Sequence, residues 1–175
     1  ILDCSRHLNK ILDFNAEQLT VRVQPGVVLD QLNAYLRPLG LFFPIDISSL
    51  SRATLGGMVA TDASGKGSLI YGKTSDHIES LELVLADGSD YSAKSISIDD
   101  MPEQDAVVQN MLKPTCRQLI NHREEINRVF PLMDRGLTGY NLKHSIDAEN
   151  NLQPCYLMAG SEGTLAITRQ ITLSV

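Results

Sequence analysis

Apolar and polar residues alternate in two stretches of the first half of the chain, and each stretch predicts a β-hairpin. In residues 11–24 an apolar run is followed by a polar turn at 15–18 and then by a strand with apolar residues at every second position, Leu19, Val21 and Val23. In the second stretch a similar strand is followed by Asp87-Gly88, a dipeptide that favours a tight turn; its apolar positions are Leu81, Leu83 and Leu85.

Apolar residues recur at helical spacing in two other stretches. The first predicts a helix over 27–38 that Gly40 ends, with an apolar side made by Val28, Leu29, Leu32, Tyr35 and Leu36. The second predicts two helices between 103 and 130, and the later one has Pro114 in its first turn, where proline is tolerated. Their apolar residues are Val107, Val108, Met111 and Leu112, then Leu119, Ile120, Ile126 and Val129.

The last segment predicts a strand, after a polar and irregular stretch at 131–154. Arg169 is the one polar residue on its apolar side, which consists of Leu165, Ile167, Ile171, Leu173 and Val175. Strands joined by hairpins, with helices between them, predict an α+β fold with a mixed or antiparallel sheet rather than a doubly wound parallel sheet.

Two glycine-rich segments are the candidates for ligand binding. Residues 41–75 predict a long loop with one short helix, and within them Thr54 to Gly65 combines glycines with small side chains. Such a backbone can bring successive N–H groups to an anion without Lys or Arg. The second segment, Gly160 to Ile167, leads directly into the last strand. Considered alone, the first segment is about equally compatible with a flexible surface turn, and the second favours an ordinary glycine turn before a strand.

Other catalytic patterns are absent from the sequence. It contains no Walker loop, no Rossmann fingerprint between a strand and a helix, and no Gly-x-Ser-x-Gly elbow. No pair of its histidines, His7, His77, His122 and His144, has metal-ligand spacing on a helix. We therefore predict no metal site and assign no catalytic residue. For His77, which follows the glycine-rich loop, we expect a structural or surface role.

Composition narrows the class of protein further. The 175 residues are 43% apolar and carry a net charge of −6, which argues for a folded domain and against binding to nucleic acid or an anionic membrane. No segment has the pattern of a signal peptide or a membrane span. Cys4, Cys116 and Cys155 are odd in number and widely spaced, which favours a reducing compartment. We expect a cytoplasmic protein, with attachment at the periphery of the inner membrane as an alternative.

The order of the motifs resembles one family, the FAD-binding domain of the vanillyl-alcohol oxidase or PCMH type, in its FAD-linked oxidase branch. This branch includes D-lactate dehydrogenases, the glycolate oxidase D subunit and D-2-hydroxyglutarate dehydrogenases. The resemblance rests on Val23-Gln24-Pro25-Gly26, Phe43-Pro44, Thr54-Leu55-Gly56-Gly57 with Ala63-Ser64-Gly65, Tyr71-Gly72, Leu83 to Gly88, and Gly160 to Leu165. Gly57 to His77 and Leu137 to Leu142 look most like the large bacterial members that carry a cysteine-rich iron–sulfur C-terminal region, which in the full protein would add a 4Fe-4S cluster.

The resemblance implies a bound FAD and assigns residues to it. These are Pro44, Thr54, Gly56, Gly57, Ala60, Thr61, Ala63, Ser64, Gly65, Tyr71, Gly72, Glu162, Gly163, Leu165, Ala166 and Ile167. Asp62 stands where the family commonly has Asn, which would alter one flavin contact and points to the bacterial subgroup. The implied reaction is hydride transfer from the α-carbon of a D-2-hydroxyacid to the flavin, followed by transfer of electrons to an acceptor.

Two expectations concern the extent of the domain. Ile1-Leu2-Asp3 is typical of the end of a strand, so we expect residues 1–175 to be part of a larger PCMH-type domain, with a truncated N-terminal subdomain. We expect a phosphate-binding loop upstream and a substrate domain downstream, so that the 175 residues alone bind FAD weakly and lack dehydrogenase activity. The alternatives are an FAD-dependent oxidase acting on an alcohol or sugar, and a non-catalytic domain that binds a partner.

Overall fold

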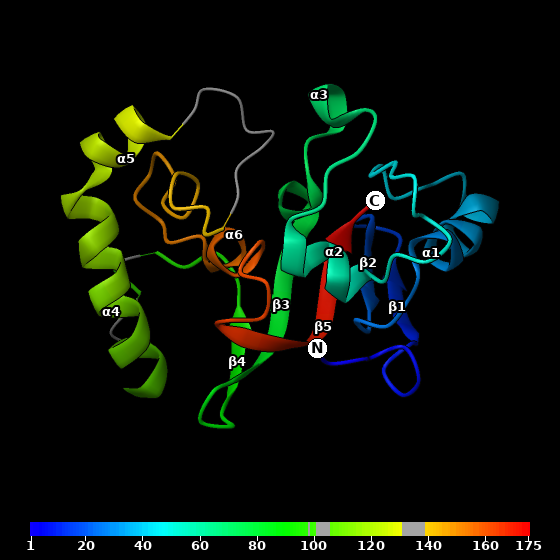
Figure 1. Ribbon diagram of the computed structural model, residues 1–175, viewed down its shortest axis with the longest axis horizontal. Helices are drawn as coiled ribbons and strands as arrows, with labels where there is room; N and C mark the ends of the chain where they lie inside the picture. The colour runs from blue at the N-terminus through cyan, green and yellow to red at the C-terminus, as the bar shows by residue number, and fades with distance from the viewer. Residues whose placement is uncertain (98, 101–105, 131–138) are drawn as a thin grey trace.

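A five-stranded antiparallel sheet is the centre of the protein (Figure 1). The computed structural model describes residues 1–97, 99–100, 106–130 and 139–175. The strand order is β1-β2-β5-β3-β4, so the last strand lies between two hairpins. The strands are β1 (Ile11–Asn15), β2 (Thr20–Val23), β3 (Ile78–Leu85), β4 (Asp90–Ala93) and β5 (Ala166–Ser174).

Helices flank this sheet on both sides. In Figure 1, α1 lies beyond the β1–β2 hairpin, whereas α4 and α5 lie beyond β4 at the opposite side of the molecule. The helices are α1 (Leu29–Leu36), α2 (Leu55–Thr61), α3 (Ser68–Tyr71), α4 (Ala106–Asn121), α5 (Arg123–Val129) and α6 (Pro154–Met158), with two short 3₁₀ turns, η1 (Arg37–Leu39) and η2 (Thr74–His77). The α+β fold predicted from the sequence is therefore confirmed. Every strand pairing among the described residues is antiparallel.

One face of the sheet forms the core. Val23, Ile171, Leu81 and Ala93 lie directly opposite one another across β2, β5, β3 and β4, and all are fully buried. Cross-strand neighbours of this kind are the unit of sheet packing, because their side chains meet on the same face. Leu29, Leu32 and Leu36 cover this core from α1, and Leu55, Met58 and Val59 cover it from α2.

The two hairpins and the first helix agree with the sequence prediction, with one exception. Leu19 does not belong to the strand: it has φ 51° in the turn, and 45% of its surface is exposed. The strand starts at Thr20, and only Val21 and Val23 point into the core. α1 continues into η1 and ends at Gly40, whose φ of 73° is the left-handed conformation that glycine accommodates.

The prediction of a helix break at Pro114 is wrong. α4 runs through Pro114 without interruption, and the break falls at His122, before α5. The Thr115 hydroxyl donates to the carbonyl of Met111 at 3.0 Å within this stretch. Ile120 and Val129 are exposed by 43% and 62%, so the predicted apolar stripe is only partly buried. The predicted start of this helical region at 103–105 and the side chain of Val107 lie outside the described residues.

The long segment 41–75 contains more regular structure than the sequence predicted, namely α2, α3 and the start of η2. Leu137 and Thr138, part of a motif quoted above, lie outside the described residues. Among those that the structure describes, 139–153 are irregular as predicted, and α6, which follows them, was not predicted. Residues 1–3 do not form the strand that their sequence suggested.

β5 is not the regular alternating strand that the sequence predicted. Glu82 pairs with Gln170 but Leu83 pairs with Thr168, so Arg169 is an extra residue in β5 and forms a bulge. The bulge reverses which side chains face the core: Ile171 and Leu173 are buried, but Ile167 is 48% exposed. Arg169 pairs instead with Asp90 at 3.1 Å on the surface. No helix in the described part of the chain is both long enough and apolar enough to cross a membrane.

Candidate functional site

A broad cavity of about 1060 Å³ lies between α2, the turn before β5 and the N-terminal segment. In Figure 1 the N-terminus lies beside the bend of β5, and Ile1 lines this cavity together with Ala166, Ile167 and Thr168. Protein sites for organic ligands commonly measure about 300–1,000 Å³. The cavity is therefore large enough for a cofactor the size of a dinucleotide.

The first wall of the cavity is α2, which begins at Thr54. The Thr54 hydroxyl accepts a hydrogen bond from the backbone N–H of Gly57 at 3.3 Å, which caps the helix. Gly56 lies close to Pro25: its N–H donates to the Pro25 carbonyl at 2.8 Å, and a β-carbon on Gly56 would come within 2.5 Å of the Pro25 side chain. Glycine at this position is thus required by backbone packing.

The second wall is the turn from Gly160 to Gly163, and hydrogen bonds hold it against α2. The N–H of Gly160 donates to the carbonyl of Val59 at 2.9 Å, and the N–H of Glu162 donates to the carbonyl of Ala60 at 2.9 Å. Gly160, Glu162 and Gly163 all have positive φ angles, so the chain turns sharply here. A β-carbon on Gly163 would have no neighbour within 4 Å, which leaves the surface of the cavity open at this point.

The chemistry of the cavity lining suits a polyanionic cofactor that is held by backbone and hydroxyl groups. Thr54, Thr61, Ser161 and Thr168 provide hydroxyls, and the small residues Gly56, Gly57, Ala60, Gly163 and Ala166 leave room for close approach. Among the described residues, the lining contains no Lys, Arg or His. The N–H groups of Gly56, Gly57, Gly160 and Glu162 all donate within the protein. A phosphate in this cavity would therefore depend on hydroxyl donors and on close approach to the backbone, and it would lie near the Asp3 and Glu162 carboxylates.

The structure brings together more than half of the residues that the sequence assigned to FAD. Those that line the cavity are Thr54, Gly56, Gly57, Ala60, Thr61, Glu162, Gly163, Ala166 and Ile167. They come from both glycine-rich segments, which are separated by about a hundred residues in the chain. Their meeting in one cavity is the main geometric finding about the site, and their contact with FAD remains a prediction.

Pro44, Tyr71 and the remaining predicted residues do not line this cavity. Pro44 and Tyr71 line a second, smaller cavity of about 340 Å³, where Phe42 meets the Tyr71 ring edge-on at 6.1 Å between centroids. Gly65 packs closely on the backbone of Asp46: a β-carbon added at Gly65 would lie 1.9 Å from the Asp46 carbonyl oxygen, so this position requires glycine. The others outside the large cavity are Ala63, Ser64, Gly72 and Leu165.

Several cavity residues were not predicted. Met158 reaches the cavity from α6, and the N-terminal residues Ile1 to Cys4 form one edge of it. Pro25, Leu83 and Ser161 lie within motifs that the sequence analysis quoted, so these motifs could have indicated them, but they were not assigned to the cofactor. Val59 and Thr168 also line the cavity. Met158 had no local signal, because its place depends on how α6 packs.

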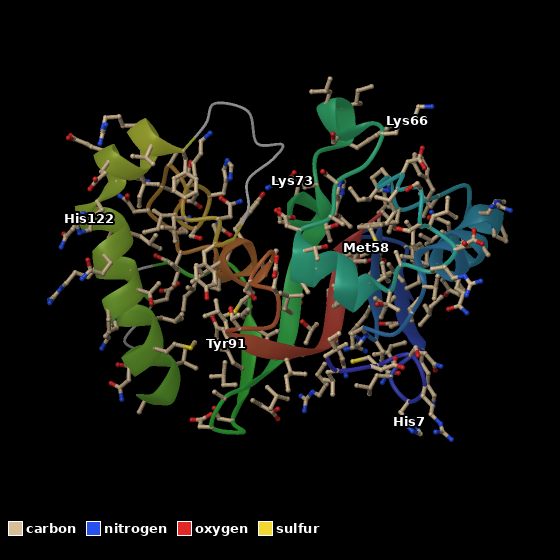
Figure 2. The ribbon with its side chains drawn as sticks, in the orientation of Figure 1. His7, Met58, Lys66, Lys73, Tyr91 and His122 are labelled. Atoms are coloured by element: carbon tan, nitrogen blue, oxygen red, sulfur yellow. The ribbon has the colours of Figure 1, made fainter. Side chains whose placement is uncertain are left out.

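Asp62, which follows α2, forms a buried ion pair with Lys73. Their side chains are 10% and 6% exposed, and Nζ of Lys73 lies 2.7 Å from Oδ2 of Asp62 (Figure 2 labels Lys73). The second carboxylate oxygen of Asp62 accepts from the N–H of Ser75 at 2.9 Å. Neither residue of the pair lines the large cavity. The Asp62 carboxylate thus has partners within the protein.

The histidines have structural or surface positions. His77 packs its ring against Phe43 with centroids 5.5 Å apart, and its Nε2 lies 2.7 Å from the Tyr71 carbonyl oxygen. Figure 2 shows His122 on the outer edge of the molecule, where 56% of its side chain is exposed. In the described ranges, no group of three or more His, Cys, Asp or Glu residues is placed to hold a metal ion.

The fold and the cavity together define an α+β domain with a large cavity lined by glycines and hydroxyl residues, and comparison with known proteins identifies it more closely. A family model described as FAD binding domain matches residues 1–92, more than half of the 175. The chain belongs to this family of FAD-binding domains. The residues that line the cavity fit the cofactor that this family implies, since they combine small side chains with hydroxyl groups.

Relatives with established names agree with this family. D-2-hydroxyglutarate dehydrogenase of Pantoea ananatis is 44% identical and that of Escherichia coli 39% identical, each across 100% of this chain. Glycolate oxidase subunit GlcD of Bacillus subtilis is 44% identical, over 47% of this chain and 18% of its own length. The chain covers 18% of each of the two D-2-hydroxyglutarate dehydrogenases. The resemblance to the FAD-linked oxidase branch is therefore confirmed.

A solved structure confirms the fold independently. Alkyldihydroxyacetonephosphate synthase superposes with a TM-score of 0.56 at 22% identity, and the match covers 97% of this chain and 21% of that one. At this level of identity the comparison supports the architecture alone.

Proposed function

We propose that the protein is the FAD-binding part of a D-2-hydroxyacid dehydrogenase, with D-2-hydroxyglutarate as its first candidate substrate. The observation that carries the proposal is the extent of the sequence match. Four D-2-hydroxyglutarate dehydrogenases match across 100% of the chain at 39–44% identity. A D-lactate dehydrogenase and the glycolate oxidase subunit match only 48% and 47% of it.

This chain provides the cofactor cavity in the proposal. The chemistry that FAD would supply here is acceptance of a hydride from the α-carbon of the hydroxyacid and transfer of the electrons to a separate acceptor. The hydroxyl proton would leave to a base that we assign to another part of the full-length protein, and the product would be a 2-oxoacid. The turn at 160–163 and the face of α2 would hold the cofactor through their hydroxyls and through close contact with the backbone. Pro44, Tyr71 and Gly72 would support it from the neighbouring loop. We assign the residues that select the substrate to other parts of the full-length protein, because the chain spans 18% of the length of the D-2-hydroxyglutarate dehydrogenase that it matches.

The first test is made on the purified full-length protein. Its absorbance spectrum should show bound flavin, and D-2-hydroxyglutarate should reduce a redox dye faster than D-lactate, with the 2-oxoacid as the product. A preference for D-lactate would instead favour assignment as a D-lactate dehydrogenase. Oxidation of an alcohol or a sugar that has no carboxylate would show that the substrate is not a hydroxyacid. The absence of both flavin and turnover would favour a partner-binding domain and refute the proposal.

A variant can test the cavity itself. Gly57 faces open space except for the Thr54 hydroxyl, which would lie 3.1 Å from an added β-carbon. Gly57→Leu should therefore fold and fill the cavity, lowering FAD affinity by about 100-fold, the effect of about 3 kcal/mol. Arg52→Leu is the matched control, because Arg52 is exposed, lies just before α2 and does not line the cavity. Equal FAD binding by both variants would show that the cofactor lies elsewhere.

A further inference from the structure

The buried pair of Asp62 and Lys73 is unlike the other ion pairs of the described residues. The remaining pairs lie on the surface, with side chains between 44% and 74% exposed. Surface pairs contribute little to stability, whereas two buried charges depend on each other. If one partner is removed, the other remains as an uncompensated charge in the interior. The pair is therefore positioned to fix the local geometry.

The pair joins the end of α2 to the segment that leads into β3. Asp62 ends α2 in a left-handed conformation, with φ 46°, directly after the cavity residue Thr61. Next to the ion pair, the backbone N–H and the hydroxyl of Thr74 both donate to the carbonyl of Ala63, at 3.0 and 2.7 Å. An isolated β-bridge joins Ser64 to Lys73. Through the ion pair, these hydrogen bonds and the β-bridge, residues 62–64 after α2 are held against Lys73 and Thr74 at the start of η2.

The same end of α2 carries the second wall of the cavity. The carbonyls of Val59 and Ala60 accept the N–H groups of Gly160 and Glu162, as described above. A β-carbon on Gly160 would also lie 3.4 Å from the β-carbon of Asp62. A shift of Asp62 would therefore move the turn at 160–163 together with Thr61. The ion pair lies behind the cavity and supports both of its walls.

We propose that Asp62 and Lys73 are a pair of positioning residues for the cofactor cavity, which act through α2 and the turn at 160–163 without touching the cofactor. This inference rests on the proposed function. It also explains why an acid stands at position 62. The buried Lys73 requires a negative partner, and Asn could not neutralise it. The two charges cancel locally, so that the acid adds no net negative charge behind a site for a polyanion.

The test uses Asp62→Asn, Lys73→Met and the double variant in the full-length protein. Asp62→Asn retains an oxygen for the Ser75 N–H but leaves Lys73 unpaired, whereas the double variant removes both charges. Asp90→Asn is the matched control, because it breaks the exposed pair with Arg169. Hydrogen exchange of the cofactor-free protein reports on the walls, and flavin titration reports on binding.

Each single variant should raise exchange at residues 57–64 and 160–163 by about 100-fold, while α4 exchanges as in the wild type. FAD affinity should fall by about tenfold or more, and the double variant should recover most of both effects. Asp90→Asn should change neither. Wild-type exchange in the single variants, or an increase spread equally over α4, would overturn the inference. So would single variants that exchange faster at the walls but bind FAD like the wild type. A wild-type protein without flavin would refute the proposed function, and the exchange data would still decide the role of the pair.

Discussion

The backbone N–H of Glu162 donates to the carbonyl of Ala60 across 2.9 Å, and this bond joins two segments that lie far apart in the chain. Glu162 has φ 53°, an uncommon conformation for a residue other than glycine. Backbone in such a conformation persists when its surroundings hold it there. The cavity wall is therefore defined by main-chain geometry, and changes to that geometry should affect binding more than changes to exposed side chains.

The first prediction concerns Gly160, whose φ is 79° and whose added β-carbon would lie 3.1 Å from the Gly139 carbonyl. Gly160→Ala should lower stability by about 1–2 kcal/mol for the left-handed conformation alone, and should weaken FAD binding as the turn moves. Gly88→Ala is the control, because Gly88 has φ 85° and open space around it at the β3–β4 turn. Denaturant unfolding and flavin titration would compare them. Similar loss of FAD affinity in both variants would argue against a specific role for the turn.

The second prediction uses Cys4, which lies at the edge of the cavity. Burial and the neighbouring Asp3 raise the pKa of its thiol, so alkylation should be slower than that of an ordinary thiol at neutral pH and should accelerate as the pH rises past the ordinary thiol pKa of about 8.5. Bound FAD should slow this alkylation. Cys116 and Cys155 are buried, and burial raises the pKa of Cys155 to about 12, so both should react slowly under either condition. Mass spectrometry of the alkylated peptides would measure the rates, and a Cys4 rate unaffected by FAD would place the cofactor outside this cavity.

The third prediction concerns the cap of α2. Thr54→Ala removes the hydroxyl that accepts the Gly57 N–H and should cost about 1 kcal/mol of stability. Thr54→Ser keeps an equivalent oxygen and should remain within about 0.5 kcal/mol of the wild type. Chemical denaturation of the three proteins would test this. A Thr54→Ser variant as unstable as Thr54→Ala would mean that the methyl group, rather than the cap, matters.

The fourth prediction concerns Asp147, in the irregular segment before α6. Burial raises the pKa of Asp147, but hydrogen bonds from Asn151 and Gln153 outweigh it, so the pKa lies below its usual value. A carboxylate with a lowered pKa in the folded state stabilises the fold above its unfolded pKa of about 3.9, and that contribution is lost as the pH falls further. The contribution should not exceed about 1 kcal/mol, since solvent screens the group.

Asp147→Asn would test this assignment. The variant should be less stable than the wild type at pH 7, and the difference should shrink as the pH falls below the unfolded pKa of about 3.9 and Asp147 becomes protonated. Stability measured by denaturant at several pH values would show the convergence. A constant difference at all pH values would mean that the pKa of Asp147 is the same in the folded and unfolded states, against the assignment.

The sequence predicted those parts of the fold whose signals are local. Val21 and Val23 alternate with polar residues, and Leu29, Leu32 and Leu36 follow a helical period, so their faces could be recognised. Pro114 misled the prediction, because a proline is typical of a helix start but can be tolerated inside a long helix packed on one side. The bulge at Arg169 could not be recognised, because the extra residue is defined by its pairing with β3.

In the candidate site, too, the sequence predicted the residues with local signals and missed those that depend on tertiary packing. The glycines at 56, 57 and 163 indicated close backbone approach, and all three line the cavity. The partnership of Asp62 with Lys73 was not predicted, because it depends on a turn that brings residues eleven positions apart into contact. Met158 and the N-terminal residues reach the cavity only through tertiary packing.

The order of the strands has a consequence for how the protein comes to bind its cofactor. Among the described residues, the β1–β2 and β3–β4 hairpins precede β5 in the chain, and β5 is the strand that joins them. Pairings between residues so distant in the chain form slowly, since the intervening segment must first be ordered. One wall of the cavity is the start of the same strand. We therefore expect the cavity to form only once β5 has paired with both hairpins, and the cofactor to enter after that step.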